Sequence, residues 1–160
     1  TMGGSVASKL GFSDVITSLL ALDSYVEFVH EGVISLSDFL TMKPLTDVLV
    51  RIIIKKDGRR VSYDAVQKSA TDFPILASAV SYYDGTWAVV LGGRPGVAKR
   101  IDFEGSLPLL ENELDELLQR ISDEIIMGSN YLGSREYRNM LAKVLTKRNV
   151  GKISGGNHGN

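Results

Sequence analysis

The first half of the chain alternates short apolar runs with turn-forming residues, a pattern typical of mixed helices and strands. An apolar run at residues 15–22 predicts a helix, and Ser13 or Asp14 before it is a suitable N-cap. β-branched and alternating runs come next and predict strands. These strands are expected at residues 25–30, 33–36 and 49–54, with one helical turn at 37–40.

The second half begins with runs that predict a small antiparallel sheet. The pair Asp84-Gly85 is a strong signal for a tight hairpin turn. Trp87 follows this turn and is expected in the core, because large aromatic side chains are mostly buried. The strands are expected at residues 61–67, 75–82 and 87–91, with a further short strand within 98–103.

Two amphipathic helices are predicted at the end of the chain. The first has leucine and isoleucine at helical spacing on one face: Leu110, Leu114, Leu117, Leu118, Ile121 and Ile125. The second follows Ser134 as N-cap and has its own apolar stripe: Tyr137, Met140, Leu141, Val144 and Leu145. We therefore expect an α+β fold in which these helices pack against a three-stranded antiparallel sheet.

A charged, glycine-containing segment near residue 57 is the candidate boundary between two parts of the chain. We expect one unit at residues 1–56 and a second at 57–150. Residues 151–160 contain four glycines and little apolar content, which predicts a flexible tail.

Composition and charge exclude several classes of function. The net charge of −1 leaves no basic excess to neutralise phosphates, so no nucleic-acid partner is expected. The chain has no cysteine and two histidines, which argues against disulfides, iron–sulfur ligation and a metal centre in this chain. No apolar run reaches the roughly 20 residues of a membrane span, and no signal peptide is visible, so we expect a cytoplasmic protein.

The candidate chemistry lies in the first eight residues, where two adjacent glycines are flanked by hydroxyl side chains. Without Cβ atoms the main chain can approach a ligand closely, and successive N–H groups can form a concavity for an anion. Asp14 is placed to accept a hydrogen bond from a ribose hydroxyl or to cap the next helix. The spacing matches neither the G-x-G-x-x-G fingerprint nor a P-loop, and a glycine pair is also commonly a simple turn. The hydroxyls are those of Thr1, Ser5 and Ser8.

An ordered set of segments resembles the FAD-binding subunit of the molybdenum hydroxylases. This family includes xanthine dehydrogenase, aldehyde oxidase and carbon monoxide dehydrogenase. The N-terminal residues 1–14 resemble the family's T-I/L-G-G-N-I/L-A…S-D segment. Residues 19–29 resemble L-L-A-L-D-A-x-V-E-L, residues 91–95 resemble the glycine pair after the sheet, and residues 133–141 resemble G-S-A-E-Y-R-R-x-L.

The resemblance implies a fold and an electron-transfer function. Residues 1–56 would be part of the second FAD-binding subdomain, and 57–150 the C-terminal domain of the flavoprotein subunit. The first FAD subdomain would precede Thr1, so the chain is interpreted as a fragment. Electrons would pass from a molybdopterin subunit through an iron–sulfur subunit to FAD, and then to an acceptor such as NAD. A cofactor-free docking module for those subunits is the alternative.

The resemblance also assigns roles to individual residues. The FAD phosphates would meet Thr1, Met2, Gly3, Gly4 and Ser5. Asp14 would hold the ribitol or ribose hydroxyls, and the Leu49 backbone would border the flavin. Two positions depart from the family pattern: Ser5 replaces the usual Asn, and Asp64 stands where many members have Lys near the flavin ring. Because half of the cradle would be absent, this chain alone is expected to bind FAD weakly or not at all.

Overall fold

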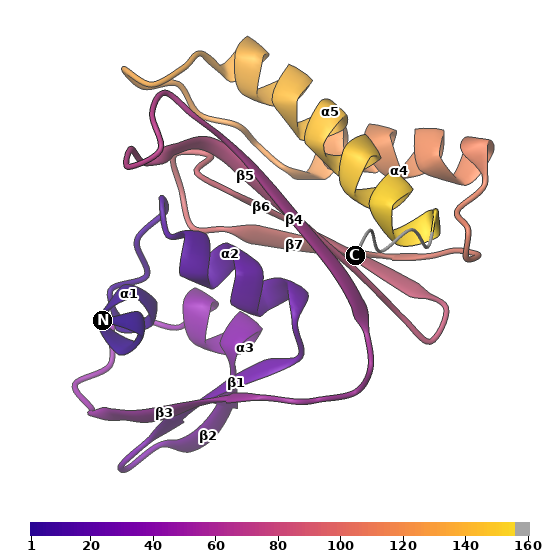
Figure 1. Ribbon diagram of the computed structural model, residues 1–160. Helices are drawn as coiled ribbons and strands as arrows, with labels where there is room; N and C mark the ends of the chain where they lie inside the picture. Colours follow the sequence, from indigo (N-terminus) through magenta and orange to yellow (C-terminus); the bar gives the residue numbers. More distant parts are fainter. Residues whose placement is uncertain (156–160) are drawn as a thin grey trace.

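The computed structural model describes residues 1–155, in which helices and strands form four stacked layers (Figure 1). The N-terminal part contains three helices and one antiparallel sheet of strand order β2-β1-β3. Its elements are α1 (Met2–Ala7), α2 (Asp14–Ala21), β1 (Ser24–Phe28), β2 (Gly32–Ser35), α3 (Leu36–Thr41) and β3 (Leu49–Ile54).

The C-terminal part contains a second antiparallel sheet, of strand order β4-β5-β6-β7, and two helices. Its elements are β4 (Arg60–Gln67), β5 (Pro74–Tyr83), β6 (Thr86–Gly92), β7 (Lys99–Glu104), α4 (Glu111–Glu124) and α5 (Arg135–Ser154). The expected α+β class with antiparallel sheets is confirmed. The short strand expected within residues 98–103 forms β7 and pairs with β6 over its whole length, so this sheet has four strands where a three-stranded sheet was expected.

The second sheet is covered on both faces (Figure 1). One face packs against α2, and its Ala79 and Val90 belong to the same core as Ile16 of α2 and Val26 of β1. The opposite face packs against α4 and α5 through a larger core that includes Trp87. Because side chains alternate between the faces of a strand, a strand covered on both sides is buried along its length and mostly apolar. Eight consecutive residues of β5, from Pro74, are accordingly buried.

The final helix differs from expectation in its length and in its buried face. It continues through Gly151 to Ser154, with Ile153 buried, so the tail prediction is wrong for residues 151–154, and 156–160 lie outside the described residues. Three members of the expected apolar stripe are exposed, namely Tyr137, Met140 and Val144. The buried face of α5 includes three polar residues, Arg138, Thr146 and Asn149. It therefore differs from the face that the apolar stripe predicts.

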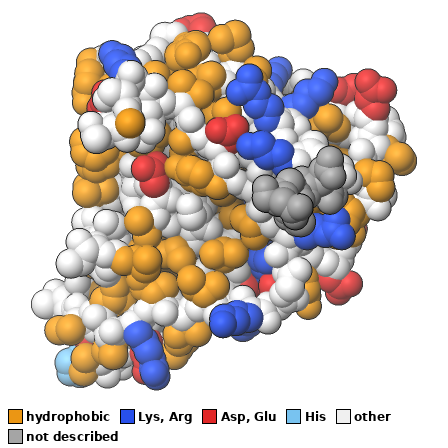
Figure 2. Space-filling view, in the orientation of Figure 1, with side chains coloured by type: hydrophobic (Ala, Val, Ile, Leu, Met, Phe, Trp, Pro, Cys, Tyr) orange, Lys and Arg blue, Asp and Glu red, His pale blue; other side chains and the backbone are white. Residues whose placement is uncertain are grey.

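The opposite side of α5 is basic and faces solvent. Its exposed Lys and Arg side chains cluster over the helix in Figure 2. None of the helices within residues 1–155 has the length and apolar content needed to cross a membrane. The same part of the chain contains no group of three or more His, Asp or Glu side chains arranged to hold a metal ion.

Candidate functional site

The glycine-containing N-terminal segment forms the start of a short helix, not the glycine-lined concavity that the sequence predicts. The Thr1 hydroxyl accepts a hydrogen bond from the Gly4 N–H at 3.1 Å and caps α1. The Thr1 carbonyl accepts a hydrogen bond from the Ser5 N–H at 3.0 Å. Neither Gly3 nor Gly4 has a positive φ. The predicted backbone concavity is therefore corrected to a helix N-terminus.

A side chain at either glycine would bring α1 into contact with a neighbouring group. A Cβ at Gly3 would lie 3.7 Å from Leu49 Cδ2, which is an ordinary contact, whereas one at Gly4 would lie 3.1 Å from the Thr1 hydroxyl. Val6 is fully buried and fixes α1 in the core shared with α2 and β3. The start of α1 and Leu49, which were both predicted to meet FAD, therefore lie side by side.

Asp14 begins α2 and makes a hydrogen bond to the neighbouring sheet. Ser13 is the N-cap, since its hydroxyl accepts a hydrogen bond from the Ile16 N–H at 3.2 Å. Asp14 Oδ1 accepts a hydrogen bond from the Tyr63 hydroxyl of β4 at 2.9 Å. Burial raises the pKa of Tyr63, and the hydrogen bond to Asp14 raises it further. Tyr63 therefore stays a neutral donor that holds one oxygen of this carboxylate and leaves the other available.

A cavity of about 380 Å³ opens between α1, α2 and β4. Met2, Asp14 and Tyr63 line it. The rest of its wall is small or apolar apart from one amide and one hydroxyl, and consists of Val15, Ser18, Leu19, Ala65 and Gln67. Such a cavity, with an apolar wall and one carboxylate at its edge, suits a ligand that combines an apolar ring with hydroxyl groups.

The structure brings the predicted residues to one region in two groups. Met2 and Asp14 line the same cavity, and Gly3 adjoins Leu49. The remaining three complete the capped turn at the start of α1 and are Thr1, Gly4 and Ser5. Their roles toward a cofactor stay predictions.

Asp64 lies on the opposite face of β4 from Tyr63. Its Oδ2 atom is 3.4 Å from the Lys152 Nζ of α5. Successive residues of a strand point to opposite faces, so Tyr63 reaches α2 while Asp64 reaches α5. The Asp64 carboxylate is thus directed away from the cavity.

Sequence reasoning missed Tyr63. Forty-nine residues separate it from Asp14, and no local pattern connects a strand tyrosine to a helix aspartate at that distance. The usable signal was the alternation of β4, which places Ala65 and Gln67 on the same face as Tyr63 and beside the same cavity.

Comparison with curated proteins finds a relative in Escherichia coli. The chain is 27% identical to the K12 protein YgfM over 147 residues, which are 91% of this chain and 55% of YgfM. No family model matches the sequence. The chain thus spans about half the length of the curated relative that it matches.

Comparison with solved structures finds the same fold in chains of oxidoreductases. Quinoline 2-oxidoreductase from Pseudomonas putida 86 matches with a TM-score of 0.76 and 21% identity, over 98% of this chain and 61% of that chain. A carbon monoxide dehydrogenase from Hydrogenophaga pseudoflava that lacks the Mo-pyranopterin moiety matches with a TM-score of 0.78 and 17% identity. That match covers 96% of this chain and 60% of the other. The layered α+β arrangement described above is therefore the fold that these oxidoreductase chains contain.

Proposed function

We propose that this chain is part of the FAD-binding subunit of a molybdenum-hydroxylase-type oxidoreductase. The observation that carries the proposal is the match of nearly the whole chain to chains of carbon monoxide dehydrogenase and quinoline 2-oxidoreductase. The N-terminal motif is the second support, because its Met2 and Asp14 line one cavity and its Gly3 lies beside Leu49. FAD, when bound, supplies the acceptance and release of electrons; the chain's residues bind and orient it.

The start of α1 fits the diphosphate of FAD. The first N–H groups of a helix have no acceptor within the helix, and Thr1 satisfies only the N–H of Gly4. The N–H groups of Met2 and Gly3 therefore point out of the helix end, where the helix dipole favours an anion. Gly3 has no side chain to obstruct the approach, so these groups would hold the diphosphate.

Asp14 and the cavity fit the remaining parts of FAD. The Asp14 carboxylate accepts hydrogen bonds, and Tyr63 fixes its orientation from one side. Ribitol or ribose hydroxyls would be the natural donors to its other oxygen. The apolar side chains around it, including Val15 and Leu19, would exclude water from an adjoining ring.

The proposed partners follow from the resemblance to the molybdenum hydroxylases. In that family, electrons pass from a molybdopterin subunit through an iron–sulfur subunit to FAD, and we propose the same two partner subunits here. Residues 1–160 contain no cysteine, the ligand that iron–sulfur clusters need. We propose that another part of the same subunit supplies the first FAD subdomain, since this chain covers 55% to 61% of the proteins it matches.

FAD titration of the purified full-length subunit tests the proposal. We expect stoichiometric uptake with a flavin absorbance spectrum, whereas residues 1–160 alone bind FAD weakly or not at all. A full-length subunit that stays colourless with excess FAD would leave the cofactor-free docking module as the better interpretation. Tight stoichiometric binding by residues 1–160 would show that α1, Asp14 and Leu49 form a sufficient site.

Gly3→Ala separates cofactor binding from folding. A methyl group fits beside Leu49, and alanine favours a helix over glycine by about 1 kcal/mol, so stability should hold or rise. FAD affinity of the full-length subunit should nevertheless fall about tenfold, because the methyl group enters the approach to the N–H groups. Gly151→Ala is the matched control, since a Cβ there meets nothing within 4 Å and α5 lies on the other side of the second sheet. Equal FAD affinity of both variants would remove α1 from the site.

A further inference from the structure

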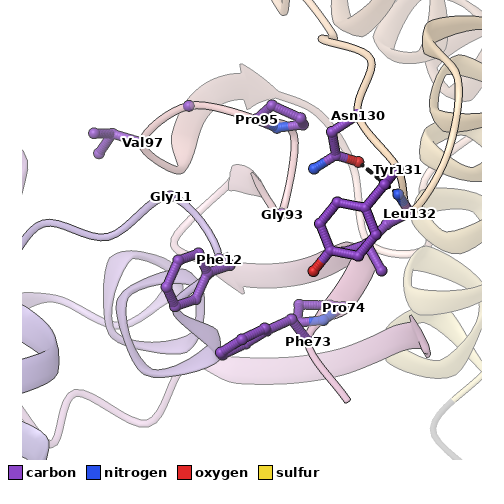
Figure 3. Close-up of a pocket in the computed structure, with 11 residues that line it drawn as sticks. Gly11, Phe12, Phe73, Pro74, Gly93, Pro95, Val97, Asn130, Tyr131 and Leu132 are labelled. Carbon is purple, nitrogen blue, oxygen red and sulfur yellow. Dashed lines mark hydrogen bonds between the residues drawn. The ribbon is translucent and has the colours of Figure 1, made fainter. Parts of the chain in front are cut away.

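A second cavity, of about 460 Å³, lies among four loops (Figure 3). The loops are the α1–α2 connection, the entry to β5, the β6–β7 connection and the segment before α5. None of the residues lining this cavity lines the one beside Asp14. It is therefore separate from the cavity beside Asp14 that is proposed to bind FAD.

Aromatic side chains form two walls of this cavity. Phe12 and Phe73 pack together with ring centroids 4.2 Å apart, and Tyr131 stands on the other side (Figure 3). Phe73 is 49% exposed and Tyr131 is 81% exposed. Leaving large apolar side chains in water forgoes the free energy that their burial would supply. Here they stand beside a concave space that a ligand can fill.

The cavity wall carries no charged side chain. All eleven lining residues are glycine, proline, aliphatic, aromatic or asparagine. An ionised ligand would lose its hydration there without an ion-pair partner, which is costly. An uncharged ligand is therefore favoured, and the flat faces of Phe73 and Tyr131 favour a planar ring.

Main-chain contacts and a side-chain hydrogen bond hold three of the four loops in place, so the cavity is largely formed in advance. The Gly93 N–H donates to the Gly11 carbonyl at 2.9 Å, which ties the β6–β7 loop to the α1–α2 loop. A Cβ at Gly11 would lie 2.5 Å from the Gly96 carbonyl oxygen, so these two loops touch through their main chains. Arg138 donates to Asn130 Oδ1 at 2.5 Å and fixes the loop that carries Tyr131. Such pre-organisation lowers the cost of binding.

We propose that this cavity is a binding site for a small, uncharged, planar ring compound. Its volume falls within the range of about 300 to 1,000 Å³ typical of small-molecule pockets, and its lining has the predominantly apolar character of such pockets. Walls from four separate loops enclose a compact ligand better than an extended polypeptide. The ring stacks against Phe73 and Tyr131.

Titration of the full chain with 2-naphthol, a neutral fluorescent two-ring compound, tests the proposal. We expect saturable binding at one site per chain and a blue shift of naphthol emission on leaving water. 2-Naphthalenesulfonate, which has the same rings with a negative charge, should bind at least tenfold more weakly. Amide NMR shifts on adding 2-naphthol should be largest at Gly11, Gly93 and Leu132.

Two variants and one control identify the cavity as the site. Phe73→Ala and Tyr131→Ala should each weaken 2-naphthol binding about fivefold, the equivalent of one lost aromatic contact. Both side chains are exposed, so the variants should fold, as a circular dichroism spectrum will verify. Ile126→Ala removes an apolar side chain that is 75% exposed and lies outside the cavity wall, and should bind 2-naphthol as the wild type does.

Any one of four results would overturn the proposal. Three concern affinity: the absence of saturable 2-naphthol binding by the wild type, wild-type affinity in both aromatic variants, and equal affinity for the sulfonate. The fourth is NMR shifts confined to the cavity beside Asp14. Loss of FAD binding in the experiment above leaves this proposal unchanged, because the two cavities share no residue.

Discussion

At the scale of single residues, Arg138 shows how one buried cation organises a loop. It is fully buried, and its guanidinium donates to four neutral oxygen atoms. These are the carbonyls of Ile75 at 2.8 Å, Gly128 at 3.0 Å and Gly133, together with Asn130 Oδ1. The planar fork of donors matches several acceptors at once, which a lysine cannot do. Arg138 thereby joins the start of β5 to the loop before α5.

Arg138→Met should therefore destabilise the protein by about 3 kcal/mol or more, as measured by urea unfolding. Each buried acceptor that loses its donor costs about 1–3 kcal/mol, and methionine can replace only the packing. Arg135→Met removes an equivalent charge from an exposed position of the same helix and should change stability by less than about 0.5 kcal/mol. Similar stabilities of the two variants would mean that these hydrogen bonds do not hold the loop.

Asp47 is a second residue whose hydrogen bonds decide its behaviour. Burial by itself would raise its pKa, but hydrogen bonds from the Glu31 N–H, the His30 ring, the His30 N–H and the Val48 N–H together hold the pKa well below its usual value. The carboxylate thus joins the β1–β2 turn to the segment before β3, with His30 Nδ1 at 3.0 Å.

Asp47→Asn should be less stable than the wild type at pH 7, and the difference should shrink in acid. A carboxylate with a lowered folded-state pKa contributes stability that is complete above its unfolded value, near 3.8, and is lost as the pH falls toward the folded value. Thermal unfolding between pH 7 and pH 2.5 measures this. Asp115→Asn, on the exposed surface of α4, is the control. A wild-type advantage that persists undiminished below pH 3 would contradict the argument.

At the scale of elements, sequence patterns predict the helices and turns that are stabilised by residues close together in the chain. The β5–β6 hairpin was predicted from Asp84-Gly85, and both residues have the positive φ that a tight hairpin turn requires. The helix at residues 14–21 was predicted from one apolar run after a cap. By contrast, α1 has only six residues, two of them glycine, and depends on the Thr1 cap and on Val6 in the core. Local propensity does not indicate such a helix.

Long-range pairing explains what the sequence could not indicate about the site and α5. The residues predicted to meet FAD are near one another in the chain, except Leu49, which the family resemblance supplied. Tyr63 depends on a contact between distant elements and was missed. Likewise the buried face of α5 includes Asn149, whose side chain donates to the Ser78 carbonyl at 3.0 Å and accepts from the Ser62 hydroxyl at 2.7 Å. Hydrophobicity alone assigns such a residue to the surface.

The contact between α2 and β6 is close enough to test by substitution. A Cβ at Gly92 would lie 1.9 Å from the Thr17 hydroxyl oxygen, and Thr17 is fully buried. Gly92→Ala should cost about 2–3 kcal/mol, because α2 must move away from the sheet or Thr17 must change rotamer. Thr17→Ala in the same chain should recover about 1 kcal/mol of this loss in a double-mutant cycle. Strictly additive effects of the two substitutions would show that Gly92 and Thr17 do not determine how closely α2 packs against β6.

At the scale of the whole molecule, α2 connects the two sheets. Its C-terminal carbonyls accept from side chains in and next to the second sheet: the Ser81 hydroxyl at 2.6 Å and Arg100 Nη1 at 2.9 Å, with Arg59 Nη1 at 3.3 Å. Its apolar face shares one core with β1 and with Ala79 of β5. The chain passes from one sheet to the other between β3 and β4, where the boundary near residue 57 was predicted. The division into two units at that point stays a prediction.

Because α2 belongs to the core of both sheets, we expect the two halves to open together. Native-state hydrogen exchange measures this: the buried amides of Val26 in β1 and Val80 in β5 should exchange with the same free energy of opening. Leu20→Ala, which removes a buried side chain of α2, should lower both values equally, by about 2–4 kcal/mol. Val144→Ala on the exposed side of α5 should lower neither appreciably. A distinctly lower opening free energy at Val26 alone would mean that residues 1–56 unfold as a unit of their own, in agreement with the boundary predicted from the sequence.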